Sequence, residues 1–419
     1  MCLPELALES WEDIFRPALV LKQTLAHSLN PTRPISRRCR SIRANPHGVS
    51  TVAANPIVHA SPIAVMGTGS ALPANRLSTA ALLAAISPYL SDSTQRLAVR
   101  LVKKLGIEGR NFSRALVRPI EAPADGDTAP RLLAIAMRAA LRAAQLDVSN
   151  LGMLIGHTTT PHTLLPSNVA WVAEELEFHG PHLELRQACT GFAAAAVCSA
   201  ALIDSGAAPI AVAGSEVGSV MLDLHRLGGD SAQLVNCLQM GDGAGAIILG
   251  AVQHERQSQL QCVFYGSLNA SHAPAISLPH GGSGSPALPC GAVPHFHHDY
   301  AAVRRRGAEL LKAGLAASMA AGIDKHSIDW WMPQQVNGRM PEFCAQAFDL
   351  PAERVICEAS TLGNLGSAAM WVALDRVRRS ERLRPGDRVL AFGAEASKFM
   401  YGGFLYVHGY DAPMPREAA

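Results

Sequence analysis

An internal repeat is the feature of this chain that most constrains its fold. In two places an Ala-rich helix ends near an aspartate, a short polar turn follows, and an apolar strand leads into a polar tip. The two aspartates are Asp147 and Asp324, which lie 177 residues apart (324 − 147). Cys189, at a predicted strand-to-helix turn, has its counterpart in Asn364, 175 residues further on (364 − 189). Two offsets this close predict a duplicated domain.

The elements around the repeat predict the class of fold. Helices are predicted in three segments of the first half: 79–86, 94–105 and 131–144. Their alternation with apolar strands is typical of an α/β layered fold. If the two halves pack face to face, the equivalent strand ends of the two halves meet near the centre. In sheets of this kind, ligands bind at the carboxyl ends of the strands. We therefore expect Cys189, Gln334 and Asn364 to come together.

Three parts of the chain are predicted from composition and from the repeat. Residues 1–60 form an N-terminal extension whose arginines, prolines and serines are typical of an exposed, mobile arm. Residues 61–252 form the half that carries Cys189, and residues 253–419 form the second half. The folded part is expected to begin at Ile63 with a short apolar strand. The GTGS sequence that follows is expected to be a plain turn, because it lacks the spacing of a dinucleotide site.

Composition excludes several classes of function. With 419 residues, 48% of them hydrophobic, the chain can bury a large core. A formal charge of +2 gives no support for nucleic-acid binding. The nine cysteines contain no CxxC pair and are odd in number, which favours reduced thiols and a cytoplasmic location. No apolar run approaches the roughly 18 to 20 residues of a membrane span, and no secretion signal is recognised.

Cys189 is the strongest candidate for a nucleophile. The segment Leu183–Ala207 is predicted to run as a buried strand through Cys189 into an Ala-rich helix. Free N–H groups and the helix dipole at such a turn favour the thiolate, which is the nucleophilic form. The alternative is that Cys189 is a small buried hydrophobic residue, as many free cysteines are.

Two further clusters have the composition of binding sites. His295, His297 and His298, with Asp299, resemble a metal cluster in composition, but adjacent ligands in a Pro/Gly-rich loop lack the usual spacing, so we expect no metal. The run 304–306, three arginines at the start of a predicted helix, could meet an acidic carrier protein by charge complementarity. A solvated helical face is the alternative for that run.

Motifs spaced along the chain from about Ile63 to His408 resemble the β-ketoacyl-acyl-carrier-protein synthase III group of the thiolase superfamily. The motifs are MGTGSALP, TTTPHTLLPSN, QACTGF, MGDGAGAIILG, MPQQVNGRM, LGNLGSAA and AFGAEASKFMYGG. The resemblance implies a thiolase-like duplicated αβαβα layered fold. It also implies a homodimer that meets at the TTTPHTLLPSN segment, and thioesters of coenzyme A or acyl carrier protein as substrates, with no permanently bound cofactor.

The resemblance also implies a catalytic set of cysteine, histidine and asparagine. Cys189 and Asn364 match, whereas Gln334 stands where the family has its histidine. Glutamine can donate a hydrogen bond to an oxyanion but cannot shuttle a proton near neutral pH, so decarboxylation of a malonyl thioester is expected to be weak. The backbone N–H groups of Cys189 and Gly393 would form the oxyanion hole.

Three other positions depart from the family's pattern. Arg100 stands where the family has a tryptophan that stacks on the adenine of coenzyme A. His162, after TTTP, occupies a position that is commonly acidic, and it is either a substitute imidazole or a surface or interface residue. Glu395 lies in the terminal glycine-rich motif as a possible base or as a structurally paired acid. We treat His162 and Glu395 as possible auxiliary site residues.

Three functions remain open at this point. The first is an acyl-transferring condensing enzyme that loads an acyl group on Cys189 and joins it to a carbon nucleophile, in fatty acid, polyketide or related secondary-metabolite biosynthesis. The second is an acyltransferase that makes an ester or amide without decarboxylation, which Gln334 fits better. The third is a non-catalytic partner subunit of a heteromeric ketosynthase, which the retention of Cys189 and Asn364 disfavours.

Overall fold

The computed structural model describes residues 56–114, 116, 127–207, 209–268, 272–287 and 294–410. The chain divides into two units, Met1–Val52 and Ala53–Ala419. The predicted N-terminal extension, 1–60, lies outside the described residues except for its last few positions. All the described residues belong to the second unit.

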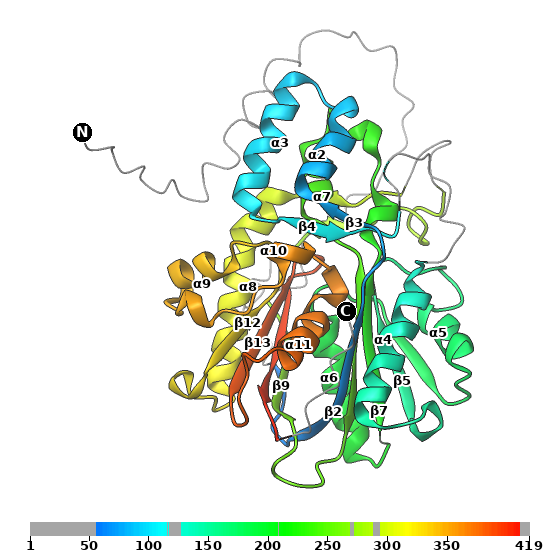
Figure 1. Cartoon of the computed structure of the whole chain (residues 1–419), viewed down its shortest axis with the longest axis vertical. Helices are drawn as coiled ribbons and strands as arrows, with labels where there is room; N and C mark the ends of the chain where they lie inside the picture. Colours follow the sequence, from blue (N-terminus) through cyan, green and yellow to red (C-terminus); the bar gives the residue numbers. More distant parts are fainter. Residues whose placement is uncertain are drawn as a thin grey trace, which may run out of the picture. The chain divides into compact units, whose positions relative to one another are not determined.

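The second unit alternates strands and helices along the chain (Figure 1). The strands are β1 (Ile57–His59), β2 (Ile63–Ala71), β3 (Arg76–Ser78), β4 (Gly109–Asn111), β5 (Met153–His157), β6 (His182–Leu185), β7 (Ile210–Glu216), β8 (Gly243–Gly250), β9 (Gln259–Ser267), β10 (Ile276–Ser277), β11 (His297–His298), β12 (Trp330–Pro333), β13 (Arg388–Glu395) and β14 (Met400–Val407). The α-helices are α2 (Thr79–Ile86), α3 (Asp92–Leu105), α4 (Ala129–Ala144), α5 (Asn168–Leu176), α6 (Gly191–Asp204), α7 (Ser231–Gln239), α8 (Tyr300–Ala320), α9 (Met340–Phe348), α10 (Ala359–Leu362) and α11 (Ala369–Arg379).

The strand order repeats between the two halves. The first half has the order β6-β5-β7-β8-β2, and the second has β12-β13-β14-β9, with a parallel bridge from Trp331 to Val355 beyond β12. In each half the last strand, β8 or β14, runs antiparallel to both of its neighbours. The first strands of the two halves, β2 and β9, pair through Ile63 and Leu260 and join the halves into one sheet. The predicted duplicated α/β fold is confirmed.

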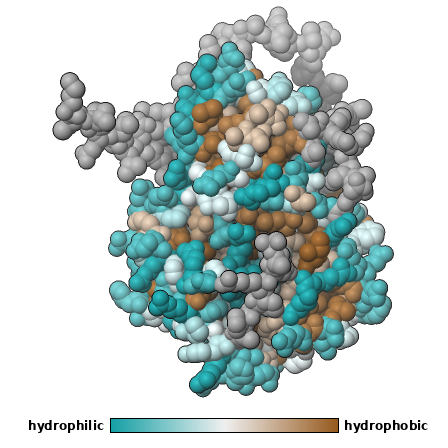
Figure 2. Space-filling view, viewed as in Figure 1, coloured by the Kyte–Doolittle hydropathy of each residue, from teal (hydrophilic) through white to brown (hydrophobic). Residues whose placement is uncertain are grey.

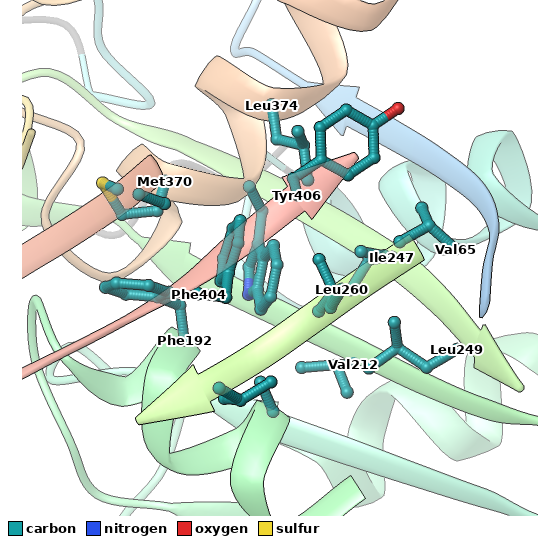
Figure 3. Close-up of a cluster of buried hydrophobic side chains, with 14 of the residues drawn as sticks. Val65, Phe192, Val212, Ile247, Leu249, Leu260, Met370, Leu374, Phe404 and Tyr406 are labelled. Atoms are coloured by element: carbon teal, nitrogen blue, oxygen red, sulfur yellow. The ribbon is translucent and has the colours of Figure 1, made fainter. Parts of the chain in front are cut away.

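Hydrophobic burial sorts the helices into layers. Buried residues of α6 and α11 form one cluster with strands from both halves, shown in Figure 3. On the other side of the first-half strands, α4 and α5 bury a second cluster, and beyond the second-half strands the α8 and α9 residues bury a third. Strand β8 lies between the first two clusters and contributes to both. Its residues Ile247 and Leu249 belong to the middle cluster, and Ala246 and Ile248 belong to the outer one. This alternation of side chains is the period of a strand that is buried on both faces.

The repeated aspartates hold equivalent positions. Asp147 is the N-cap of a 3₁₀ turn that leads into β5, and Asp324 is the N-cap of a 3₁₀ turn that leads into β12. In both turns the same short connection separates the aspartate from the strand. Aspartate is favoured at such positions because its side chain can accept hydrogen bonds from the free N–H groups of the turn. The sequence repeat therefore corresponds to a structural repeat.

The predicted turn at GTGS is wrong, because these residues lie inside β2. Helix α4 packs directly on this strand, and a Cβ atom on Gly67 would stand 2.2 Å from the Ala140 carbonyl oxygen. At Gly69 the corresponding distance to the Ala136 oxygen would be 2.3 Å. The glycines thus allow close approach of a helix to a strand rather than a change of chain direction.

The surface over α2 is hydrophobic, as Figure 2 shows, in keeping with the alanine and leucine content of that helix. No helix in the described part of the chain is long and apolar enough to cross a membrane.

Candidate active site

A cavity of about 620 Å³ lies where the two halves meet at the ends of their strands. Its walls include Cys189 and Asn364, which are the equivalent residues of the sequence repeat. Two carboxylates, Glu216 and Glu395, and the imidazole of His162 also line it. The predicted meeting of Cys189 and Asn364 from distant parts of the sequence is therefore present in the structure.

Cys189 lies in the loop between β6 and α6. Strand β6 ends at Leu185, so the predicted strand that runs on to Cys189 is four residues too long. Helix α6 starts at Gly191, and its next residue, Phe192, packs edge-on against Trp371 and Phe404 at 5.9 and 5.7 Å between ring centroids. These aromatic contacts fix the start of the helix in the middle layer, and Cys189 with it.

The predicted preference of Cys189 for the thiolate is wrong. Burial raises the pKa of the Cys189 thiol well above its usual range, and the nearby charges of Glu395 and Glu216 raise it further. Desolvation and two carboxylates therefore outweigh the start of helix α6. A base that accepts the thiol proton would therefore assist an attack by Cys189.

Glu395 is tied to the residue that follows the cysteine. Its Oε2 accepts hydrogen bonds from the Thr190 main-chain N–H at 3.1 Å and from the Thr190 hydroxyl at 2.7 Å. Its Oε1 accepts a hydrogen bond from the hydroxyl of Ser397. The side chain is buried at the end of β13 and lines the cavity. Three donors from two loops thus hold a carboxylate next to Cys189.

Glu216 is a site residue that the sequence analysis missed. It ends β7, whose seven residues are all buried, and one of its oxygens accepts from the hydroxyls of Thr159 at 2.8 Å and Thr160 at 2.6 Å. The other oxygen accepts from the Ser367 hydroxyl at 2.8 Å and from the Ser367 N–H at 3.1 Å. Burial raises the pKa of Glu216 despite these bonds. An acidic residue at the carboxyl end of a largely apolar segment, IAVAGS, was the available signal.

Asn364 is held by backbone contacts to the end of α7. Its N–H donates to the Gln239 carbonyl at 2.8 Å, and it forms a parallel bridge with Met240. Its Oδ1 accepts a hydrogen bond of 3.0 Å from the Gly366 N–H. Because this bond occupies the amide oxygen, the amide NH₂ is the end of the side chain that can donate to a ligand.

Gln334 and Gly393 lie next to each other and beside the ring of Phe192. Gln334 is 1% exposed, and within the described residues neither its Oε1 nor its Nε2 has a hydrogen-bond partner. A Cβ on Gly393 would stand 3.3 Å from Gln334 Oε1 and 2.6 Å from a ring carbon of Phe192. Neither residue is among the described residues that line the cavity. Their roles as oxyanion donors stay predictions.

His162 lies at the exposed side of the cavity. Its main-chain N–H donates to Asn168 Oδ1 at 3.2 Å, and its ring meets Trp171 edge-on at 5.7 Å. His162, for which both a substitute imidazole and a surface residue were expected as alternatives, is thus an exposed residue that lines the same cavity as Cys189. Arg100, by contrast, is exposed on α3 and does not line the cavity.

The histidines near Asp299 do not gather around a common point. Among the described residues, no group of three or more His, Cys, Asp or Glu side chains is arranged to hold a metal ion. His298 instead turns to Asn236, with 3.0 Å between its Nδ1 and Asn236 Oδ1, and it stacks on Tyr300. Both His298 and Asn236 line the cavity.

Comparisons with known proteins agree with this geometry. The family model of 3-oxoacyl-[acyl-carrier-protein] synthase III matches residues 183–267, and the model of the C-terminal part of that enzyme matches residues 319–405. The first match contains Cys189, Glu216 and Asn236, and the second contains Gln334, Asn364 and Glu395.

Solved structures with the same fold cover most of the chain. The tetronic acid condensing enzyme AbyA1 is 24% identical with a TM-score of 0.71, over 82% of this chain and 99% of its own. The 3-oxoacyl-(acyl carrier protein) synthase III of Pseudomonas aeruginosa PAO1 is 24% identical with a TM-score of 0.68, over 84% and 99%. A variant of OleA from Xanthomonas campestris is 18% identical with a TM-score of 0.69, over 83% and 99%.

Proposed function

Because this chain is a β-ketoacyl-acyl-carrier-protein synthase III-like protein of the thiolase superfamily, we propose that Cys189 takes an acyl group from a thioester and passes it to a second substrate. Enzymes of this family carry out acyl-transferring condensation in fatty acid or secondary metabolism. The observation that carries the proposal is the shared cavity of Cys189 and Asn364 with two buried carboxylates.

The loading step needs a base, because the pKa of Cys189 lies above its usual range. Glu395 is the base that we assign, since it is held by the residue next to the cysteine. The thiol proton passes to Glu395 as the sulfur attacks the thioester carbonyl. The donor's thiolate then leaves and takes the proton back, which yields the acylated Cys189 and free coenzyme A or carrier-protein thiol.

The second step also has a carboxylate available. Burial raises the pKa of Glu216, which makes it a stronger base than an exposed glutamate. A C–H bond next to the thioester carbonyl of the second substrate gives its proton to Glu216, and the resulting carbanion attacks the acyl carbonyl. Cys189 leaves as a thiolate and is reprotonated from the carboxyl group. This condensation requires no imidazole and no loss of carbon dioxide.

A second candidate function follows from Gln334. An alcohol or amine could supply the proton and the attacking atom in place of the carbon acid, which would make an ester or amide. Gln334 favours this acyltransferase because the transfer requires no stabilised enolate, and a neutral amide is enough to polarise a carbonyl.

The partners are proposed on the same basis. We expect the acyl donor to be a thioester of coenzyme A or of an acyl carrier protein, and the enzyme to be a homodimer. The loop before α5 supports the dimer, because Leu164 and Leu165 are 66% and 88% exposed there and Leu164 also lines the cavity.

Incubation of the purified protein with separate acyl-coenzyme A and acyl-carrier-protein donors tests the proposal. Intact-protein mass spectrometry should show the added acyl mass, and addition of a second thioester, an alcohol or an amine should discharge it. The acceptor whose addition returns the protein to its unacylated mass identifies the reaction. A protein that gains no mass from any donor would contradict the enzyme assignment and favour the non-catalytic subunit.

A further inference from the structure

A second polar cluster lines the same cavity. It consists of Asn236, on α7, and His298, on β11, which come from distant parts of the chain. The Gln233 amide, also on α7, donates to the Phe296 carbonyl at 2.7 Å and holds the segment before His298 against the helix. Asn236 is 2% exposed, so its polar atoms are removed from bulk water.

One atom of each side chain in this cluster is satisfied. Asn236 Oδ1 accepts a hydrogen bond of 2.7 Å from the Tyr300 hydroxyl and lies 3.0 Å from His298 Nδ1, which must therefore carry the proton. The His298 ring also stacks on Tyr300, with 3.7 Å between the ring centroids. Tyr300 thus fixes the orientation of both side chains.

The opposite atoms have no partner. Asn236 Nδ2 and His298 Nε2 are buried, and neither has a hydrogen-bond partner among the described residues. Nδ2 is a donor, and Nε2 of a ring protonated at Nδ1 is an acceptor. Burial lowers the pKa of His298 to about 3, which keeps the ring neutral. Unsatisfied buried polar atoms are costly, so a pair of them on two residues that line the cavity indicates that a further polar partner is needed there.

We propose that Asn236 and His298 form a subsite for a neutral group that both accepts and donates a hydrogen bond, a hydroxyl or a carboxamide, on the acyl substrate. Both orientations of the Asn236 amide give such a subsite. If the Asn236 amide is turned over, its oxygen becomes the unpaired atom, an acceptor, and His298 carries its proton on Nε2 as the donor. In both arrangements the pair offers one donor and one acceptor.

The position of the subsite relative to the reacting atoms suits an acyl chain. The Met240 N–H donates to the Asn236 carbonyl at 2.9 Å, so the two residues are one helical turn apart, about 6 Å along α7. Met240 lies beside Asn364 through a parallel bridge. The subsite is therefore about one helical turn from Met240, the neighbour of Asn364, within the same cavity as Cys189.

This inference rests on the proposed function and deepens it, because it names the class of acyl group. A plain alkyl chain would leave Asn236 and His298 unpaired beside apolar atoms, and a carboxylate could not donate to a neutral His298. Sites built around a substrate hydroxyl discriminate strongly against the analogue without it.

The test uses pairs of acyl-coenzyme A thioesters of equal length that differ by one hydroxyl or one terminal carboxamide. Binding is measured by calorimetry on Cys189→Ala, in which transfer to the thiol cannot occur, and loading by intact mass on the native protein. We expect at least one hydroxylated or carboxamide thioester to bind and load at least about tenfold better than its alkyl partner. Asn236→Leu and His298→Phe should bring that ratio near one, and His297→Ala, the exposed neighbour on the same strand, should keep it.

The outcomes separate the two proposals. Equal binding of every polar and alkyl pair would overturn the subsite, whether or not Cys189 is loaded, and so would an unchanged preference in folded Asn236→Leu and His298→Phe. A binding preference without any loading would support the subsite and contradict the acyl transfer. If both variants fail to fold, the preference for polar over alkyl thioesters still tests the subsite, because it is measured with Asn236 and His298 in place.

Discussion

Thr190 donates two hydrogen bonds to Glu395, one of 3.1 Å from its main-chain N–H and one of 2.7 Å from its hydroxyl. This pair joins the loop of the nucleophile in the first half to the end of β13 in the second half. It has two consequences for Cys189. The charge of Glu395 raises the pKa of the thiol, and the same carboxylate is placed where it can accept the thiol proton.

Glu395→Gln should therefore change two properties of Cys189 in opposite directions. Loss of the negative charge lowers the pKa of the thiol, so the pH profile for alkylation of Cys189 should move to lower pH. Loss of the base should slow acyl loading by on the order of a hundredfold. Alkylation rates across pH, with the adduct mapped to Cys189, and single-turnover loading measure the two effects. Glu174→Gln, on the exposed face of α5, is the control. Parallel changes in alkylation and loading would refute the role of Glu395.

Gln334→His tests the link between this position and decarboxylation. An imidazole can stabilise the enolate that forms when a malonyl thioester loses carbon dioxide, and an oxyanion donor of this kind is worth on the order of a hundredfold or more. The substitution should raise the release of labelled carbon dioxide at least about tenfold and leave Cys189 loading nearly unchanged. Brisk decarboxylation by the native protein, with no gain from Gln334→His, would mean that another group such as His162 or Glu395 supplies this chemistry.

The duplication was predictable from sequence because its evidence is local. Alanine-rich helices, aspartate caps and strand tips recur at nearly constant spacing, and this recurrence also predicted that Cys189 and Asn364 would meet. The spacing of apolar residues in a strand or helix involves only residues close in the sequence. For this reason both ends of α2 were predicted correctly. The GTGS prediction failed because the decisive contact, α4 against Gly67 and Gly69, is made between distant segments.

The electrostatics of the site could not be predicted in the same way. The start of helix α6 is visible in the sequence, but Glu216 and Glu395 reach Cys189 from other strands, and their combined charge with burial reverses the expected pKa shift. Glu216 itself is recognisable as functional only when Thr159 and Ser367, far apart in the chain, are seen to hold it. The Asn236–His298 pair was hidden for the same reason.

Trp371→Phe should destabilise the middle layer. Trp371 is fully buried, stacks on Phe404 at 5.6 Å, and donates from Nε1 to His157 Nε2 at 3.0 Å. Phenylalanine keeps a ring but leaves the buried His157 nitrogen unpaired, at a cost of about 1–3 kcal/mol in the free energy of unfolding. Denaturant titration measures the loss.

Trp330→Phe is the matched control for this change. It removes a Trp Nε1 hydrogen bond of 3.2 Å to Asp387 at a half-buried position, where water can replace the donor. Its cost should be smaller than that of Trp371→Phe. Equal costs at the two positions would contradict the importance of the Trp371–His157 bond.

Sedimentation velocity at micromolar concentration tests the proposed homodimer. The native protein should sediment as a dimer, and Leu165→Asp should weaken it because a charge replaces an 88% exposed leucine that the partner would cover. Val99→Asp, which changes a 46% exposed residue on α3, should leave the dimer intact. A native monomer would refute the proposal, and a dimer that resists Leu165→Asp would place its interface elsewhere.

The acylation of Cys189 tests the central claim most directly. The native protein is incubated with the acyl donor that loads best, and its intact mass and peptide map are recorded beside those of Cys189→Ala and Cys198→Ala. Cys198 lies on the same helix, α6, but is exposed, which makes it a matched control. We predict one acyl group on the Cys189 peptide of the native protein and of Cys198→Ala, and none on Cys189→Ala. An unchanged adduct on folded Cys189→Ala would contradict the account.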